Sequence, residues 1–151
     1  MQLSVTEDFT TKLIRNNSDL PPQSELLQNE MPTGIIIRGA ILESVIQCGE
    51  YFLVFMTDDV PYEDTLSIFL LDTQLNILDS ATIGGMYLTG SLSNIKLIPP
   101  NHINFNYIDG CDCLIDILPA PKFHIPFLSP FNAVKRPFRF YRHFILSCEC
   151  V

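Results

Sequence analysis

Apolar and polar residues alternate most clearly between residues 102 and 117. In residues 102–107 every second side chain is apolar, and residues 113–117 repeat the pattern. A period of two is typical of a strand with one buried face. Asp109-Gly110 lies between the two stretches, and this dipeptide favours a type I′ turn with positive φ at both central positions. The pattern therefore predicts an antiparallel β-hairpin.

Apolar stretches on the N-terminal side predict more strands. Residues 51–56 are apolar on both faces, which indicates a strand in the middle of a sheet that is covered on both sides. Pro99-Pro100 separates one strand from the hairpin, because proline cannot join a central ladder. A turn at residues 72–76 joins two others. The predicted strands outside the hairpin are residues 35–47, 51–57, 65–71, 77–83 and 94–98.

The N-terminal segment, residues 1–31, carries signals of a helix. Ser4 and Glu7 have the spacing of a capping box, and Phe9 and Leu13 would share one helical face. We expect a short helix over about residues 5–15, packed on a β-rich body formed by residues 34–151. Short strands with helix only at the start predict a mainly β fold, an antiparallel meander closed into a sandwich or barrel.

Length and composition bound the class of protein. The 151 residues fit one domain, and 47% apolar against 17% charged residues supplies a buried core in spite of a net charge of -8. The longest apolar stretches fall far short of the ~20 residues that span a bilayer, so no membrane insertion is expected. Residues 1–8 lack the basic and apolar regions of a secretory signal. We therefore expect a single cytoplasmic domain spanning residues 1–151.

The cysteines are five, an odd number, which together with a cytoplasmic location predicts free thiols. Cys111 with Cys113, and Cys148 with Cys150, form two pairs whose members point to one side of an extended strand. Two interpretations stay open: buried, inert thiols, or four thiolates around a tetrahedral zinc ion. A one-residue gap lacks the turn that structural zinc sites favour. The sequence therefore predicts thiols, with no metal and no cofactor.

Charge is sorted along the chain. Residues 39–118 hold eleven carboxylates and one basic residue, Lys96, whereas residues 119–147 hold five lysines and arginines and no acid. Such sorting predicts two faces of opposite potential, and an acidic face suits a basic partner.

The first candidate site is an acidic loop, residues 58–64, with four carboxylates around a Pro-Tyr pair. It can be a solvated turn that protects a sheet edge, or a metal loop, although the ordered spacing of a calcium loop is missing. We favour a protein-binding loop, in which Tyr62 is an aromatic anchor. The predicted partner-binding residues are Asp58, Asp59, Tyr62, Glu63 and Asp64, with Asp109, Asp112 and Asp116 as an extension if the hairpin turn lies nearby.

A second candidate site is the basic, aromatic stretch of residues 131–144. Aromatic rings interleaved with arginine suit single-stranded nucleic acid, but a pI near 4.6 opposes phosphate binding. The structural interpretation has Phe138, Phe140 and Phe144 in the core and the arginines paired with carboxylates of the sheet. The nucleic-acid alternative would use Arg136, Arg139, Phe140 and Arg142.

Enzymatic motifs do not emerge from the sequence. Gly84-Gly85 lacks the lysine and hydroxyl residue of a phosphate loop, and there is no nucleophile elbow and no histidine pair at helical spacing. We therefore expect a non-catalytic binding protein. An enzyme of unknown reaction is the third alternative, because a triad can assemble from distant residues.

The acidic, β-rich chain resembles the immunity proteins of bacterial polymorphic and contact-dependent growth inhibition toxin systems. Its hairpins, such as residues 66–72 turning into residues 76–80, and its lack of an active-site motif are the basis of the resemblance. The resemblance implies an inhibitor that binds a cognate toxin domain, commonly a basic nuclease, and covers its active site or blocks substrate access. Carboxylates can imitate phosphates, and opposite charges speed the encounter.

Overall fold

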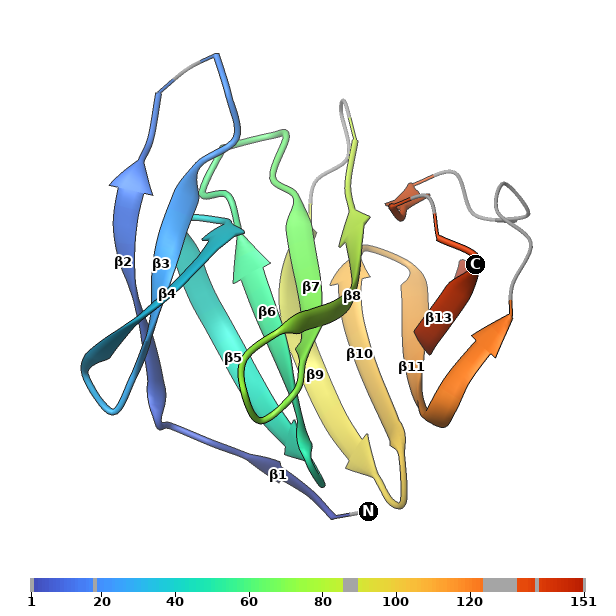
Figure 1. Ribbon diagram of the computed structural model, residues 1–151. Helices are drawn as coiled ribbons and strands as arrows, with labels where there is room; N and C mark the ends of the chain where they lie inside the picture. Colours follow the sequence, from blue (N-terminus) through green and yellow to red (C-terminus); the bar gives the residue numbers. More distant parts are fainter. Residues whose placement is uncertain (1, 18, 86–89, 124–132, 138, 151) are drawn as a thin grey trace.

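The computed structural model describes residues 2–17, 19–85, 90–123, 133–137 and 139–150. These residues form thirteen strands and no helix, in three antiparallel sheets (Figure 1). Accordingly, no helix that is long and apolar enough to cross a membrane occurs among them. The prediction of a mainly β, antiparallel fold is confirmed at this level.

The largest sheet has six strands in the order β1-β5-β6-β7-β8-β12. The second sheet has four strands in the order β13-β11-β10-β9, and the third has the order β2-β3-β4. The strands are β1 (Leu3–Val5), β2 (Phe9–Arg15), β3 (Gln23–Gln28), β4 (Met31–Arg38), β5 (Ile41–Cys48), β6 (Tyr51–Thr57), β7 (Leu66–Leu71), β8 (Ile77–Ile83), β9 (Gly90–Ile98), β10 (His102–Ile108), β11 (Cys111–Phe123), β12 (Val134–Lys135) and β13 (Tyr141–Cys150).

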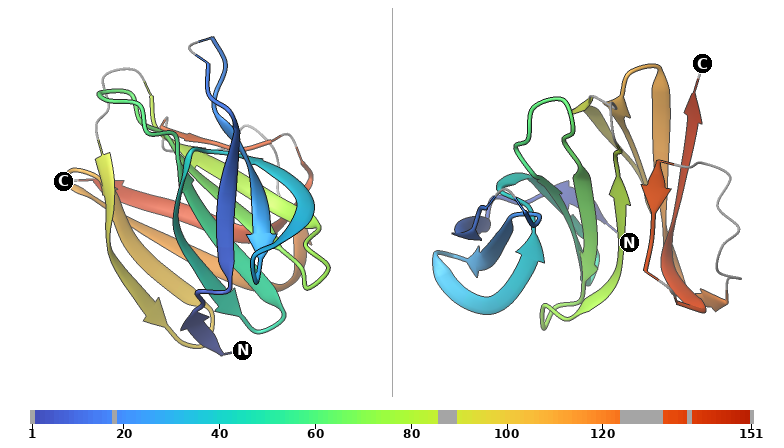
Figure 2. Two further views of the ribbon diagram at one scale, coloured as in Figure 1. Left: turned by 90° about the vertical axis from the view of Figure 1, so that its left-hand side faces the viewer. Right: turned by 90° about the horizontal axis from the view of Figure 1, so that it is seen from above.

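The three sheets form three layers, with the six-stranded sheet in the middle (Figure 2). Its inner face shares a core with the four-stranded sheet, where the Phe55 and Phe105 ring centroids lie 5.5 Å apart. Its outer face is covered by the three-stranded sheet, where Val54 packs in one cluster with Leu26 and Ile37. Strand β6 is therefore buried on both faces, as its unbroken apolar run predicts.

The predicted central hairpin is confirmed as β10 and β11, with Ile103 opposite Ile115. The turn type differs from the prediction. Gly110 has a φ of 79°, whereas Asp109 is not among the residues with positive φ, so the turn is not type I′. The hairpin of β7 and β8 is also confirmed, with Leu66 opposite Ile83.

The predicted N-terminal helix is wrong, because residues 9–15 form strand β2 and pair with β3. Phe9 is buried and its ring lies edge-on to Phe52, 5.0 Å between centroids. Ladder bonds to β3 satisfy the backbone that a helix would have satisfied internally, and the β-branched Thr10 and Thr11 favour a strand. The meander also does not close into a barrel among the described residues.

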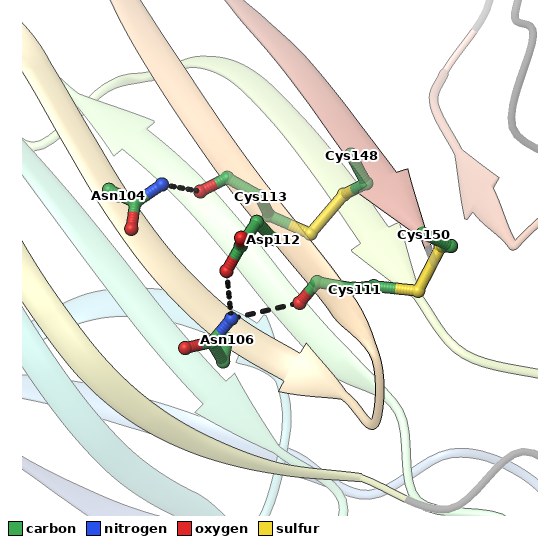
Figure 3. The surroundings of a disulfide bond; sticks show 7 residues. All are labelled: Asn104, Asn106, Cys111, Asp112, Cys113, Cys148 and Cys150. Atoms are coloured by element: carbon green, nitrogen blue, oxygen red, sulfur yellow. Dashed lines mark hydrogen bonds between the residues drawn. A yellow bond between two sulfur atoms is a disulfide. The ribbon is translucent and has the colours of Figure 1, made fainter.

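The prediction of free thiols is wrong for four of the five cysteines. The register of β11 with β13 places Cys111 opposite Cys150 and Cys113 opposite Cys148, with Cα–Cα distances of 4.0 and 4.1 Å, and both pairs are disulfides (Figure 3). The four sulfur atoms that would bind zinc in the alternative interpretation are therefore bonded in two pairs. Disulfides are typical of oxidising compartments, which weighs against the expected cytoplasmic location. Cys48 is a free, buried thiol, and burial raises its pKa to about 12.

Candidate functional site

The acidic loop, residues 58–64, leads from β6 to β7, and its first carboxylate is internal. Asp58 is only 5% exposed and forms an ion pair with Arg38 of β4, with 2.8 Å between Oδ2 and Nη2. The Arg38 Nε also donates to Oδ2 at 3.2 Å. A buried carboxylate needs such a partner, because desolvation disfavours its charge. Asp58 therefore ties the loop to the three-stranded sheet and is not available to a partner.

Asp64, the last carboxylate of the loop, organises the loop backbone. Its Oδ1 accepts hydrogen bonds from the backbone N–H groups of Asp58, Asp59 and Thr65, at 2.9, 3.1 and 3.0 Å. A loop backbone has no ladder to satisfy these donors, so one side chain replaces it. The main role of Asp64 is therefore to hold the backbone of the loop in place.

The loop displays the remaining predicted residues on its surface. Asp59, Tyr62 and Glu63 are exposed, and Tyr62 is 80% exposed, the largest value among the exposed large hydrophobic residues. Asp59 and Tyr62 have φ values of 59° and 68°. A left-handed conformation costs a bulky residue about 1 kcal/mol or more, so the surrounding contacts must impose it. For Asp59, the hydrogen bond from its backbone N–H to Asp64 is one such contact.

A shallow pocket of about 190 Å³ opens beside Tyr62. It is lined by Asp59, Val60, Pro61, Tyr62, Asp64 and Gly90. Gly90 begins β9 of the four-stranded sheet and pairs with Ile108 of β10. The pocket thus lies where the loop of one sheet meets the end of the facing sheet.

The structure brings part of the second predicted set to the same end of the molecule. Because Gly90 lines the pocket and pairs with Ile108, the turn at Asp109 follows directly at that end (Figure 1). Asp109 and Asp112 are both exposed. The Asn106 side-chain amide donates to Asp112 at 2.6 Å and to the Cys111 carbonyl at 2.9 Å, which fixes the carboxylate beside the disulfides (Figure 3).

Asp116 does not belong to this group. It pairs with His102 at the start of β10, the opposite end of that strand, and accepts a hydrogen bond from the Asn101 amide at 2.6 Å. The exposed predicted residues that share one end are Asp59, Tyr62, Glu63, Asp109 and Asp112, and we call them the acidic end.

The basic stretch has a structural role around Asp79 of β8. Asp79 is fully buried, and its carboxylate lies 2.8 Å from Arg136 Nη2 and 3.1 Å from Arg142 Nη1. It also accepts the backbone N–H of His143 at 2.9 Å. Since Arg142 and His143 belong to β13, this group joins the two large sheets. The prediction that the arginines pair with carboxylates of the sheet is confirmed for Arg136 and Arg142, but not for Arg139, which is exposed and donates to a backbone carbonyl.

Arg136 and Arg139 also donate to backbone carbonyls of β8. Arg136 Nε donates to the Ser80 carbonyl, and Arg139 Nη1 donates to the Leu78 carbonyl, both at 3.2 Å. Arg136 also lies 4.2 Å above the Phe144 ring, and burial lowers its pKa to about 10, partly offset by Asp79. The cations of the nucleic-acid alternative are thus engaged with the protein.

The predicted core role of the stretch is right for Phe144, which is fully buried, and wrong for Phe140, which is 51% exposed. Phe138 lies outside the described residues. Sequence reasoning missed Asp79 as the centre of this group. The available signal is its position, because Asp79 is two residues before Ala81 and four before Ile83, and so shares the buried face of the strand with these apolar residues.

No group of three or more His, Cys, Asp or Glu side chains that could hold a metal occurs in the described part of the chain. Comparison with known proteins finds no matching family model, no matching curated protein and no matching solved structure. The geometry of the acidic end is therefore the basis for any functional conclusion.

Proposed function

We propose that this protein is a non-catalytic binding protein that holds a basic protein partner at its acidic end. The main support is Tyr62, an aromatic side chain that is 80% exposed and displayed by a loop fixed from within. Exposed tyrosines are frequent anchors of protein interfaces because they bury a large area at a low entropic cost. Fixing the loop before binding lowers that cost further.

The charge around Tyr62 selects the partner. Asp59 and Glu63 flank it in the loop, and Asp109 and Asp112 extend the negative surface on the facing sheet. The net charge of -8 acts in the same direction at long range. Opposite potentials raise the association rate, whereas the aromatic anchor governs dissociation.

Within this class, an immunity protein is the form that we favour. The chain's acidic, β-rich character resembles such inhibitors, and a row of exposed carboxylates can occupy the phosphate-binding surface of a nuclease toxin. Binding there would cover the active site or block substrate access. The two disulfides support an encounter in an oxidising compartment, such as a bacterial periplasm, over one in the cytoplasm.

The test begins with capture of the partner from the native cell by tagged protein. The triple variant Asp59→Asn, Tyr62→Ala, Glu63→Gln should fail to retain the protein that the wild type captures. Glu50→Gln is the matched control, because Glu50 is an exposed carboxylate in the turn at the other end of β6. Retention of the same protein by the triple variant would overturn the proposed site. Lack of inhibition of a captured toxin's activity would overturn the immunity role.

A further inference from the structure

The pocket beside Tyr62 has the size of a single side chain. Its volume of about 190 Å³ lies below the roughly 300 Å³ at which small-molecule sites begin. A drug-sized ligand or cofactor therefore does not fit, whereas one side chain of a docked protein does.

The walls of this pocket combine two kinds of surface. Val60, Pro61 and the Tyr62 ring provide apolar and aromatic contact, and Asp59 and Asp64 provide carboxylates. A side chain that satisfies both must have an apolar stem and a positively charged head. Arginine and lysine are the two that do.

Gly90 forms the wall of the pocket on the facing sheet, and a larger residue cannot replace it. A Cβ atom there would collide with the carbonyl oxygen of Tyr107 and lie 3.1 Å from its ring carbon Cδ2. The wall is therefore bare backbone, and the Tyr107 ring lies directly behind it.

Tyr107 is 2% exposed, and its hydroxyl has no hydrogen-bond partner among the described residues. Burial raises the pKa of Tyr107, and the carboxylates of Asp64, Asp58 and Glu43 raise it further.

We propose that this pocket binds an arginine side chain of the partner, an inference that rests on the proposed function. The planar guanidinium can stack on the Tyr62 ring while its N–H groups bond the carboxylates of Asp59 and Asp64. Lysine offers a point charge without the stacking plane, so the site discriminates against it.

The test is an NMR titration of ¹⁵N-labelled protein with N-acetyl-arginine amide. The backbone amides of Asp59, Tyr62 and Gly90 should shift in a saturable way. N-acetyl-citrulline amide, which has a similar shape without the charge, should leave them in place. N-acetyl-lysine amide should bind more weakly than the arginine probe. Shifts spread evenly over all exposed carboxylates, or no saturable shift at all, would overturn the pocket.

Variants separate the contributions. Asp59→Asn and Tyr62→Ala should each weaken binding of the arginine probe by about tenfold, since each removes one charged or cation–π contact. Glu50→Gln should bind the probe as the wild type does. Equal affinity of all three variants for the probe would contradict the assignment of these side chains.

The outcome also separates this inference from the proposed function. If the triple variant fails to bind the partner and the wild type does not bind the arginine probe, the proposed interface is supported and the arginine pocket is refuted. If the wild type binds the arginine probe at the pocket and the triple variant still binds the partner, the partner does not use the pocket. That second result overturns both the partner assignment and the proposed interface.

Discussion

The carboxylate of Asp64 determines the shape of the acidic loop more than any other group described in it. One oxygen accepts three backbone N–H groups, so it sets the turn that exposes Tyr62. Asp58, six residues earlier, is used internally as well. Two of the four loop carboxylates therefore build the loop, and the other two, Asp59 and Glu63, face solvent.

Asp64→Ala should lower the free energy of unfolding by about 2 kcal/mol, because three N–H donors lose a charged acceptor and only water can replace it. Glu63→Ala, an exposed neighbour, should change that free energy by no more than about 0.5 kcal/mol. Urea unfolding of both variants is the measurement. Equal stability of the two would contradict the structural role of Asp64.

At the scale of elements, local patterns predicted the strands whose partners are close in sequence. The hairpin of β10 and β11 and the double-sided burial of β6 follow from alternation and from an unbroken apolar run. The residues of β2 also have apolar positions at a helical spacing, and only their pairing with β3 shows that they form a strand. Such pairing is tertiary context, which overrides local propensity.

The disulfides were beyond prediction for a related reason. Spacing alone does not give connectivity, and the register of β11 with β13 joins residues separated by 39 and 35 positions. Likewise, the charge map predicted an acidic face, but it could not show that Asp58 faces Arg38 or that Asp116 lies opposite His102, away from the hairpin turn.

Thiol titration tests the disulfides directly. Native protein isolated without reductant should show no reactive thiol, because Cys48 is buried and its pKa is about 12. Unfolding without reductant should expose one thiol per chain, and unfolding after reduction should expose five. Five thiols without reduction would show that the cysteines are free in the native compartment.

At the scale of the whole molecule, the positive tail does not form an independent face. Arg136 and Arg142 converge on the buried Asp79 and connect β8 of one large sheet with β13 of the other. The chain therefore uses part of its charge asymmetry to hold its layers together. The acidic end, which lies away from this group, keeps its exposed carboxylates for a partner.

Asp79→Ala should destabilise the fold by about 3–5 kcal/mol, because two buried guanidinium groups lose their counterion. Thermal and urea unfolding measure the loss. Arg139→Ala is the control, since Arg139 is exposed and donates to a single carbonyl, and it should cost no more than about 1 kcal/mol. A small effect of Asp79→Ala would show that the group does not join the sheets.

The central claim is that the acidic end, with Tyr62 at its centre, holds the partner. The most direct test is the dissociation constant of the purified complex for the wild type, for Tyr62→Ala, and for the control variant Lys122→Gln. We expect Tyr62→Ala to weaken the complex by about 30-fold or more, the effect of losing an interface anchor of 2 kcal/mol or more. Lys122 lies in β11 and not in the basic stretch of residues 131–144, and it is exposed. Lys122→Gln should leave the affinity within about twofold, since one distant surface charge contributes little. A complex that tolerates Tyr62→Ala and is lost in Lys122→Gln would contradict the account.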